Sequence, residues 1–307
     1  MERWAGLGDV PAGGGPSAFG PSVVAIGVFD GVHLGHRATL ARAVGAAREH
    51  GARSVVVTFD PHPATVVRPD AVPLLLCTLD ERLDRLAAAG VDATLVLPFT
   101  AELASWSAEE FAQRVLTDAL HADRIVVGTN FRFGHRAAGD VALLRQLGFG
   151  VDAVDLVGEL SSTYVRGLIA DGDVAAAANA LGRSFAVTGP VVRGDGRGRD
   201  LGFPTANLAL VPGLAVPADG VYAGRLVRAD GSTYAAALSV GTNPTFDGVE
   251  RRVEAYALDM DADMYDEIVR VEFTERLRGM VRFDSVDDLI TQMRDDVDAV
   301  RRQVTRT

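Results

Sequence analysis

Short runs of mostly apolar, often β-branched residues alternate with helical stretches along the first half of the chain. Continuous apolar runs are typical of strands that are buried on both faces. The pattern predicts strands at 23–26, 54–59, 93–97 and 124–127, and helices at 37–50, 79–89 and 108–120. This alternation indicates an α/β domain with a doubly wound parallel sheet, in which ligands bind beyond the carboxyl ends of the strands.

The predicted helix at 79–89 is amphipathic. Leu83 and Leu86 share one face, and the charged residues are expected largely elsewhere, namely Glu81, Arg82, Asp84 and Arg85. Such a helix packs its apolar face against the sheet and leaves its polar face in water.

The pattern of apolar and polar residues changes after a further predicted helix at 174–181. The next apolar runs, at 185–188, 220–224 and 234–240, are short and separated by Gly, Pro, Asp and Asn, and residues 252–258 alternate with period two. This pattern predicts a small antiparallel β-barrel, closed by an amphipathic C-terminal helix at 286–304. We therefore predict two domains, residues 1–183 and residues 184–307.

Length and composition agree with this division. A chain of 307 residues with 48% hydrophobic and 23% charged residues is expected to form two globular domains of a soluble enzyme. The net charge of -11 provides no broad basic surface for nucleic acid. The N-terminus lacks the features of a secretory signal, and no apolar run is long enough to cross a bilayer. We expect a cytoplasmic protein with no membrane partner; self-association is possible, and nothing in the sequence indicates it.

Residue types that are missing exclude several kinds of chemistry. The sequence contains no lysine, which rules out a Walker-type phosphate loop and a Schiff-base enzyme. Cys77 is the only cysteine, which rules out an intrachain disulfide and a cysteine-built zinc site and favours a buried structural thiol. All six histidines precede residue 136, so we expect any general base in the second half to be a carboxylate.

The first candidate site is the segment 27–36, Gly-Val-Phe-Asp-Gly-Val-His-Leu-Gly-His, which follows the first strand and opens the first helix. Glycines let a backbone approach a phosphate closely, and a helix start offers unpaired N–H donors. His33 and His36 stand three apart, so their imidazoles can face the same side and stabilise a leaving phosphate oxygen. The alternative is a glycine-rich turn with one capped or metal-binding histidine.

Three further segments fit loops at strand ends: 58–63 (Thr-Phe-Asp-Pro-His-Pro), 127–134 (Val-Gly-Thr-Asn-Phe-Arg-Phe-Gly) and 161–166 (Ser-Ser-Thr-Tyr-Val-Arg). Arg166 offers a planar cationic fork for phosphate. The Ser-Ser-Thr hydroxyls are equally consistent with simple helix capping. Asp60 and His62 fit either a ligand site or a turn around two prolines.

Together these segments resemble the nucleotidyltransferase superfamily with the His-x-Gly-His signature, and more closely the bacterial bifunctional riboflavin kinase/FAD synthetase. The resemblance implies a Rossmann-like domain in which the FMN phosphate attacks the α-phosphorus of ATP, releasing pyrophosphate and FAD. It also implies catalytic roles for His33, His36 and Arg166, ATP binding by Gly27, Phe29, Asp30, Gly31, Gly35, Ser162 and Thr163, and flavin binding by Asp60, His62, Asn130 and Phe133.

The second candidate site is the glycine-rich stretch 194–207, which ends in Pro-Thr-Ala-Asn. Thr205 and Asn207 carry hard oxygen ligands that suit Mg²⁺. Alone, the stretch is typical of a surface loop. With 217–222, 239–246 and 253–256 it resembles the riboflavin kinase signature, which implies a phosphate flap formed by Gly194, Gly196, Gly198 and Gly202. Glu254 is the candidate base for the riboflavin 5′-hydroxyl as the γ-phosphoryl group transfers; the alternative is an outward-facing strand carboxylate.

Two departures from the family pattern leave a second enzymatic interpretation open. The connection that leads to Ser161 is shorter than usual, and the family commonly places a glutamate where Val281 stands. The alternative is an FMN adenylyltransferase whose kinase site is weakened or lost. A flavin-binding regulator or carrier with inert sites is an alternative from a different class of protein. The expected ligands of the enzyme are riboflavin, FMN, FAD and ATP, with Mg²⁺, and the regulator would bind the same ones. The intact candidate residues at both sites argue against it.

Overall fold

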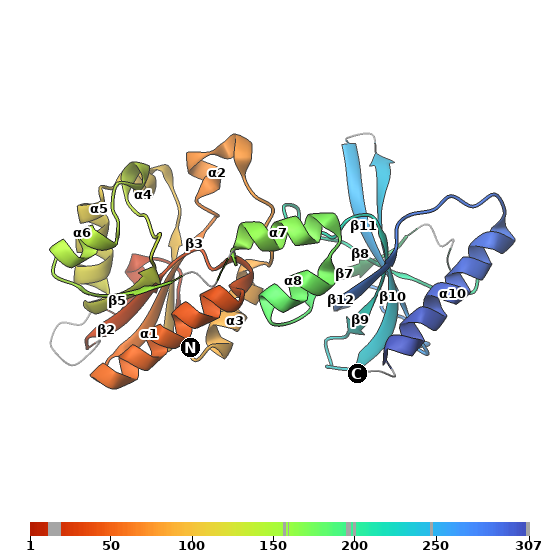
Figure 1. The fold of residues 1–307 in the computed structure, drawn as a ribbon, viewed down its shortest axis with the longest axis horizontal. Coiled ribbons are helices and arrows are strands. Elements are labelled where there is room, and N and C mark those ends of the chain that lie inside the picture. Colours follow the sequence, from red (N-terminus) through yellow and green to blue (C-terminus); the bar gives the residue numbers. More distant parts are fainter. Residues whose placement is uncertain are drawn as a thin grey trace. The chain divides into compact units, whose positions relative to one another are not determined.

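The computed structural model describes residues 1–11, 20–155, 158, 160–194, 198, 201–245 and 248–304 (Figure 1). By contacts the chain forms two compact units, Met1–Ser162 and Thr163–Thr307. Helices α7 (Ser162–Asp171) and α8 (Val174–Leu181) group with the second unit, whereas the sequence prediction placed them in the first domain. The predicted division at residue 183 concerns which residues serve each activity, and it stays a prediction.

The first unit contains a six-stranded sheet in the order β1-β4-β3-β2-β5-β6, and every neighbouring pair is parallel. The predicted doubly wound fold is confirmed. The strands are β1 (Glu2–Trp4), β2 (Ser22–Ile26), β3 (Arg53–Asp60), β4 (Ala93–Pro98), β5 (Ala122–Gly128) and β6 (Gly150–Val154). The short β1 and the half-buried β6 carry no continuous apolar run, so the sequence pattern did not reveal them.

Helices cover both faces of this sheet, and β2 shows how its residues are shared between them. Val23 and Ala25 pack in a cluster with helix α1 (Leu34–His50) and helix α3 (Leu79–Ala88), while Val24 and Ile26 pack in the opposite cluster. The opposite face is covered by α5 (Ala108–Phe111), which continues as the π-helical η4 (Ala112–Ala119), and by α6 (Val141–Gln146). Smaller pieces are η1 (Leu7–Asp9), η2 (Asp30–Val32), α2 (Ala64–Val67), η3 (Pro69–Ala71), α4 (Ala101–Ser105) and η5 (His135–Ala137).

One expectation for α3 is wrong. Leu83 and Leu86 are buried as predicted, and Thr78 and Glu81 form a capping box at its start. Arg82, however, is completely buried with them rather than lying on the polar face.

The second unit contains a closed barrel in the order β10-β11-β8-β7-β12-β9, with antiparallel neighbours. Its strands are β7 (Phe185–Val192), β8 (Ala206–Leu208), β9 (Gly220–Val227), β10 (Thr233–Thr245), β11 (Gly248–Ala257) and β12 (Ile268–Arg278). Helix α10 (Val286–Val304) has the predicted bounds. The predicted barrel with a C-terminal helix is confirmed. Within the described ranges, no helix combines the length and the apolar character that crossing a membrane requires.

Candidate active sites

The segment after β2 has a backbone that few residue types adopt easily. Phe29 and Val32 have φ values of 53° and 42°, in the left-handed region, and Gly31 has a φ of 75°. This region is rare for a β-branched residue such as Val32, and such strain clusters at functional sites. A Cβ atom on Gly31 would also lie 2.8 Å from Leu76 Cδ1, so glycine is required there. The turn delivers His33 to the start of α1.

His33 and His36 come together as their spacing predicted. His33 is the N-cap of α1, and its Nδ1 accepts a hydrogen bond of 3.3 Å from the backbone N–H of His36. The two rings stack with their centroids 3.6 Å apart and an interplanar angle of 21°. Because Nδ1 of His33 acts as an acceptor, the proton of its neutral ring lies on Nε2, which can donate to a phosphate oxygen.

The surroundings of these rings leave little space for larger side chains. A Cβ atom on Gly35 would lie 3.1 Å from His33 Cε1, so a side chain there would push against the ring. The buried Phe29 meets the His36 ring edge-on, with centroids 5.2 Å apart, and a Cβ atom on Gly27 would lie 3.2 Å from Phe29. Gly27 and Gly35 therefore allow the close packing of the two imidazoles.

A cavity of about 250 Å³ opens beside the two histidines. Asn130 and Ser162 reach it from other loops, and the Ser162 hydroxyl donates a 3.0 Å hydrogen bond to the carbonyl oxygen of Asp30. Predicted residues on its wall are Gly27, Phe29, His33, Gly35, His36, Asn130 and Ser162. The structure therefore brings together most of the predicted nucleotide-binding residues of the first unit.

A second, larger cavity of about 940 Å³ shares Ile26, Gly27 and Phe131 with the first. It is lined mainly by aromatic and aliphatic side chains at the carboxyl ends of the strands, including Phe59 near the end of β3, Phe99 after β4 and Phe133 after β5. Large apolar cavities with a few polar groups are typical of sites for aromatic ligands. A polar cavity and an aromatic cavity therefore adjoin at Gly27.

Other predicted residues of this site do not line either cavity. The buried carboxylate of Asp30 accepts hydrogen bonds of 2.9 and 3.1 Å from the backbone N–H of Leu76, so it holds a loop in place. Asp60 and His62 do not line either cavity, and Nδ1 of His62 accepts from the Ala64 N–H at 3.1 Å. Thr163 and Arg166 follow on α7 and belong to the second unit.

In the barrel, three predicted residues converge at β8 and β11. Glu254 lies directly opposite Asn207 in the strand register, and the Thr205 hydroxyl donates a 3.2 Å hydrogen bond to Glu254 Oε2. A Cβ atom on Gly194 would lie 2.4 Å from Asn207 Nδ2, so a larger residue at this point of the loop would displace the Asn207 amide. Val253 and Ala255 are buried in the core of the unit. Glu254 points the other way, as alternation along a strand requires.

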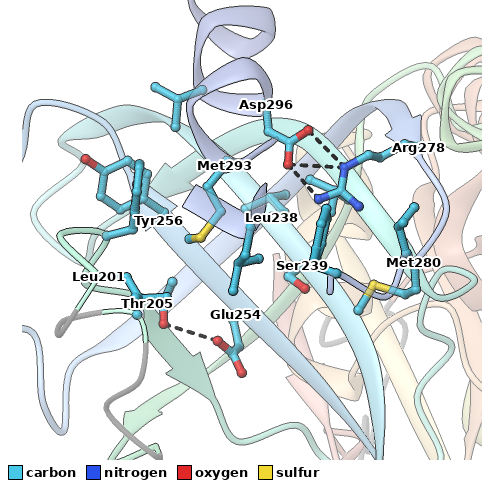
Figure 2. Close-up of a pocket in the computed structure, with 18 residues that line it drawn as sticks. Leu201, Thr205, Leu238, Ser239, Glu254, Tyr256, Arg278, Met280, Met293 and Asp296 are labelled. Carbon is cyan, nitrogen blue, oxygen red and sulfur yellow. Dashed lines mark hydrogen bonds and ion pairs between the residues drawn. The ribbon is translucent and has the colours of Figure 1, made fainter. Parts of the chain in front are cut away.

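Glu254 and Thr205 open onto a cavity of about 300 Å³ between the outer face of the barrel and α10 (Figure 2). Helix α10 contributes Leu289, Met293 and Val297, spaced four apart on one face. Predicted Gly198 lines the cavity as well. Gly202 is exposed, with a φ of 85°, and Gly196 lies outside the described residues.

An ion pair fastens α10 to the barrel at the edge of this cavity. Arg278 Nε and Nη2 donate to the carboxylate of the nearly buried Asp296 at 2.8 to 3.2 Å, as Figure 2 shows. Asp296 also accepts from Gln292 at 3.1 Å. Val281, the departure noted in the sequence, is half exposed on the cavity wall, so this substitution falls at the site itself.

Sequence reasoning missed most of the apolar cavity walls. For the first unit, a usable signal was the set of phenylalanines at or just after strand ends, because such positions meet at one edge of a parallel sheet. For the barrel, the fourfold spacing of Leu289, Met293 and Val297 was visible in the sequence. The pairing of Arg278 with Asp296 carried no local signal.

Comparisons with known proteins show which families the two halves of the chain match. Residues 16–165 match the FAD synthetase family, and residues 181–304 match the riboflavin kinase family. Bifunctional riboflavin kinase/FMN adenylyltransferases of Escherichia coli K12 and Pseudomonas fluorescens are 36% and 39% identical, covering 90% and 91% of this chain and 91% and 92% of the relatives. A crystal structure described as that of a macrolide-efflux protein from Streptococcus pneumoniae has a TM-score of 0.88 at 36% identity, covering 97% of this chain and 98% of that one. The chain therefore belongs to the family of bifunctional riboflavin kinases/FMN adenylyltransferases, the enzymes that make FMN and FAD.

Proposed function

We propose that the two activities are divided between the units, with FMN adenylylation beside His33 and His36 and riboflavin phosphorylation beside Glu254. The observation that carries the first assignment is the stacked pair of imidazoles on the wall of the polar cavity, which adjoins the larger aromatic cavity at Gly27. The polar cavity suits the ATP phosphates, and the aromatic cavity suits the isoalloxazine ring.

At the first site a phosphate oxygen of FMN attacks the α-phosphorus of ATP. The bond between that phosphorus and the bridging oxygen breaks, and pyrophosphate leaves. The nucleophile is already an anion, so no general base is needed. His33 and His36 supply N–H donors where charge develops on the leaving oxygen, and Arg166 is the predicted further cation.

Asn130 lines the polar cavity, and Phe133 lines the aromatic one. We therefore assign Phe133 to the flavin wall. The roles of Asn130, Asp60 and His62 as flavin ligands stay predictions.

At the second site the 5′-hydroxyl of riboflavin attacks the γ-phosphorus of ATP, and ADP leaves. Glu254 accepts the hydroxyl proton. The hydrogen bond from Thr205 fixes one carboxylate oxygen of Glu254, and the other oxygen is left to act as the base. Leu289, Met293 and Val297 of α10 form an apolar wall against which the flavin ring packs.

The oxygen donors of Thr205 and Asn207 fit Mg²⁺, which prefers hard ligands and keeps most of its coordination for water and phosphate. The described residues hold no cluster of three or more His, Cys, Asp or Glu side chains able to bind a metal alone, so such an ion would arrive with the nucleotide. Bound there, it would neutralise phosphate charge. The cytoplasmic location expected from the sequence stays a prediction.

The assignment is tested by incubating the purified protein with riboflavin, ATP and Mg²⁺ and separating the flavins by chromatography. We expect FMN to appear first and FAD to follow. The variant His36→Ala is expected to accumulate FMN and to form FAD about 100- to 1,000-fold more slowly. The outcome in which the wild type forms FAD from FMN, and nothing from riboflavin, supports the alternative with a lost kinase site. The other alternative, a carrier with inert sites, requires bound flavin with no ATP consumption.

A further inference from the structure

Arg82 on α3 is the largest fully buried side chain among the residues that the structure describes. Its Nε and Nη2 atoms have no hydrogen-bond partner among the described residues. Burial of a guanidinium without a carboxylate costs several kcal/mol, and an apolar side chain of similar size is often better tolerated. The stability of the core therefore does not account for an arginine at this position.

The one bonded nitrogen of Arg82 contacts two adjacent residues at the carboxyl end of β3. Nη1 donates to the carbonyl oxygen of Phe59 at 3.0 Å and to Thr58 Oγ1 at 3.3 Å. The Thr58 hydroxyl in turn donates to the carbonyl oxygen of Val28 at 2.9 Å. Arg82, Thr58 and Val28 thus form a chain of hydrogen bonds that runs from α3 to the turn after β2.

This chain ends at Val28 on the wall of the aromatic cavity, next to Gly27, which both cavities share. Gly27 lines both cavities of the first site, and Val28 and Phe59 line the aromatic one. Arg82 lines neither, so it acts from behind the wall. Bonds in such a chain polarise one another, and a positive end strengthens the next donor.

We propose that Arg82 is a positioning residue for adenylyl transfer, which acts through Thr58 on the backbone of the Gly27–Phe29 turn and directly on the carbonyl of Phe59. The proposal rests on the assignment of FMN adenylylation to this unit. Arg82 fixes the distance between the flavin wall and the turn that presents His33 and His36. Shifts of about 1 Å in such a geometry cost up to about 100-fold in rate.

The test compares Arg82→Met, Arg82→Lys, Thr58→Val and Thr58→Ser in two assays on the same preparations, FMN to FAD and riboflavin to FMN. We expect Arg82→Met and Thr58→Val to lower kcat for FAD formation about 10- to 100-fold, with riboflavin phosphorylation within about 2-fold of the wild type. Thr58→Ser keeps the hydroxyl and is expected to keep activity. Arg82→Lys, which keeps the charge and a single donor position, is expected to lie between.

A matched control separates the hydrogen bonds from the charge. Arg85 lies one turn further along α3, pairs with Glu81 at 3.7 Å and lines neither cavity. Arg82 and Arg85 both lower the pKa of the nearby Cys77 thiol, against the larger effects of burial and Asp30. Arg85→Met removes a neighbouring charge and leaves the chain intact, so FAD formation should stay within about 2-fold.

A double-mutant cycle of Arg82→Met and Thr58→Val, together with thermal unfolding, distinguishes the positioning role of Arg82 from a purely structural one. If Arg82 acts through Thr58, the double variant loses little more kcat than either single variant, and the melting temperature does not fall in proportion to the activity. Losses that multiply, a parallel fall in melting temperature, or Arg82→Met within 2-fold of the wild type would each overturn the proposal. His36→Ala is run beside them: if it retains FAD formation, the site assignment is wrong, independently of Arg82.

Discussion

Glu254→Gln is the sharpest test of proton transfer at the barrel site, because glutamine keeps the shape of the side chain and loses the base. The Thr205 hydroxyl donates to Glu254 Oε2 at 3.2 Å, and the amide oxygen of glutamine can accept the same hydrogen bond. Loss of a general base typically lowers the rate by about 100- to 10,000-fold, or about 2.7 to 5.5 kcal/mol in the activation free energy.

The structural cost of this change is smaller than its catalytic cost. A hydrogen bond to a charged group contributes about 1.5–3 kcal/mol and one between neutral groups about 0.5–1.5 kcal/mol, so the free energy of unfolding falls by about 1 kcal/mol. This corresponds to a few degrees in melting temperature for a unit of this size. When the Glu254→Gln variant is folded at the assay temperature, its lower rate therefore reports the loss of the base and not unfolding.

The assay follows FMN formation from riboflavin and ATP, with FAD formation from supplied FMN as an internal control. Glu272→Gln is the matched variant, because Glu272 lies on β12 of the same barrel, pairs with Arg270 at 2.8 Å and does not line the cavity. It should phosphorylate riboflavin within about 2-fold of the wild type. If Glu254→Gln keeps more than about a third of the wild-type kcat, the base is another group and the reasoning is refuted.

Three further experiments probe other parts of the account. Gly35→Ala places a Cβ atom 3.1 Å from the His33 ring and should lower FAD formation about 10-fold while riboflavin phosphorylation is unchanged; equal rates would show that the ring adapts freely. Thr205→Val should raise the Mg²⁺ concentration needed for half-maximal kinase activity. Thr205→Ser, which keeps the hydroxyl, should have the wild-type requirement, and a magnesium titration measures both. Burial and then Asp30 raise the pKa of Cys77, because both disfavour the thiolate in the folded protein. The protonated thiol therefore contributes its full stability below the ordinary thiol pKa, and this stability is lost as the pH rises through the raised pKa. Iodoacetamide should therefore label native Cys77 far more slowly than urea-unfolded Cys77 at neutral pH, and rapid native labelling would contradict the burial.

The fold could be predicted largely because its signals are local. The apolar runs of β2 to β5 and the amphipathic α10 are continuous segments whose periodicity shows in the sequence. The stacking of His33 on His36 follows from a spacing of three at a helix start. Burial of Cys77 was also predicted correctly from the apolar run before it.

The parts that could not be predicted depend on contacts between distant segments. Strand β8 has only three residues, and its place opposite β11, which brings Asn207 to Glu254, is a matter of register. Arg82 was expected on the polar face of α3 because charged residues are rarely buried. Its burial depends on acceptors supplied by β3, which no periodicity in α3 reveals.

The most direct test of two separate sites joined by free FMN is complementation between two inactive variants. His36→Ala and Glu254→Gln are each incubated with riboflavin, ATP and Mg²⁺, alone and mixed, and FAD is measured over time. We predict that neither variant alone forms FAD at an appreciable rate and that the mixture does, after a lag in which FMN accumulates. FAD formation by either variant alone at the wild-type rate, or a mixture that stays inactive while each variant retains its other activity, would contradict the account.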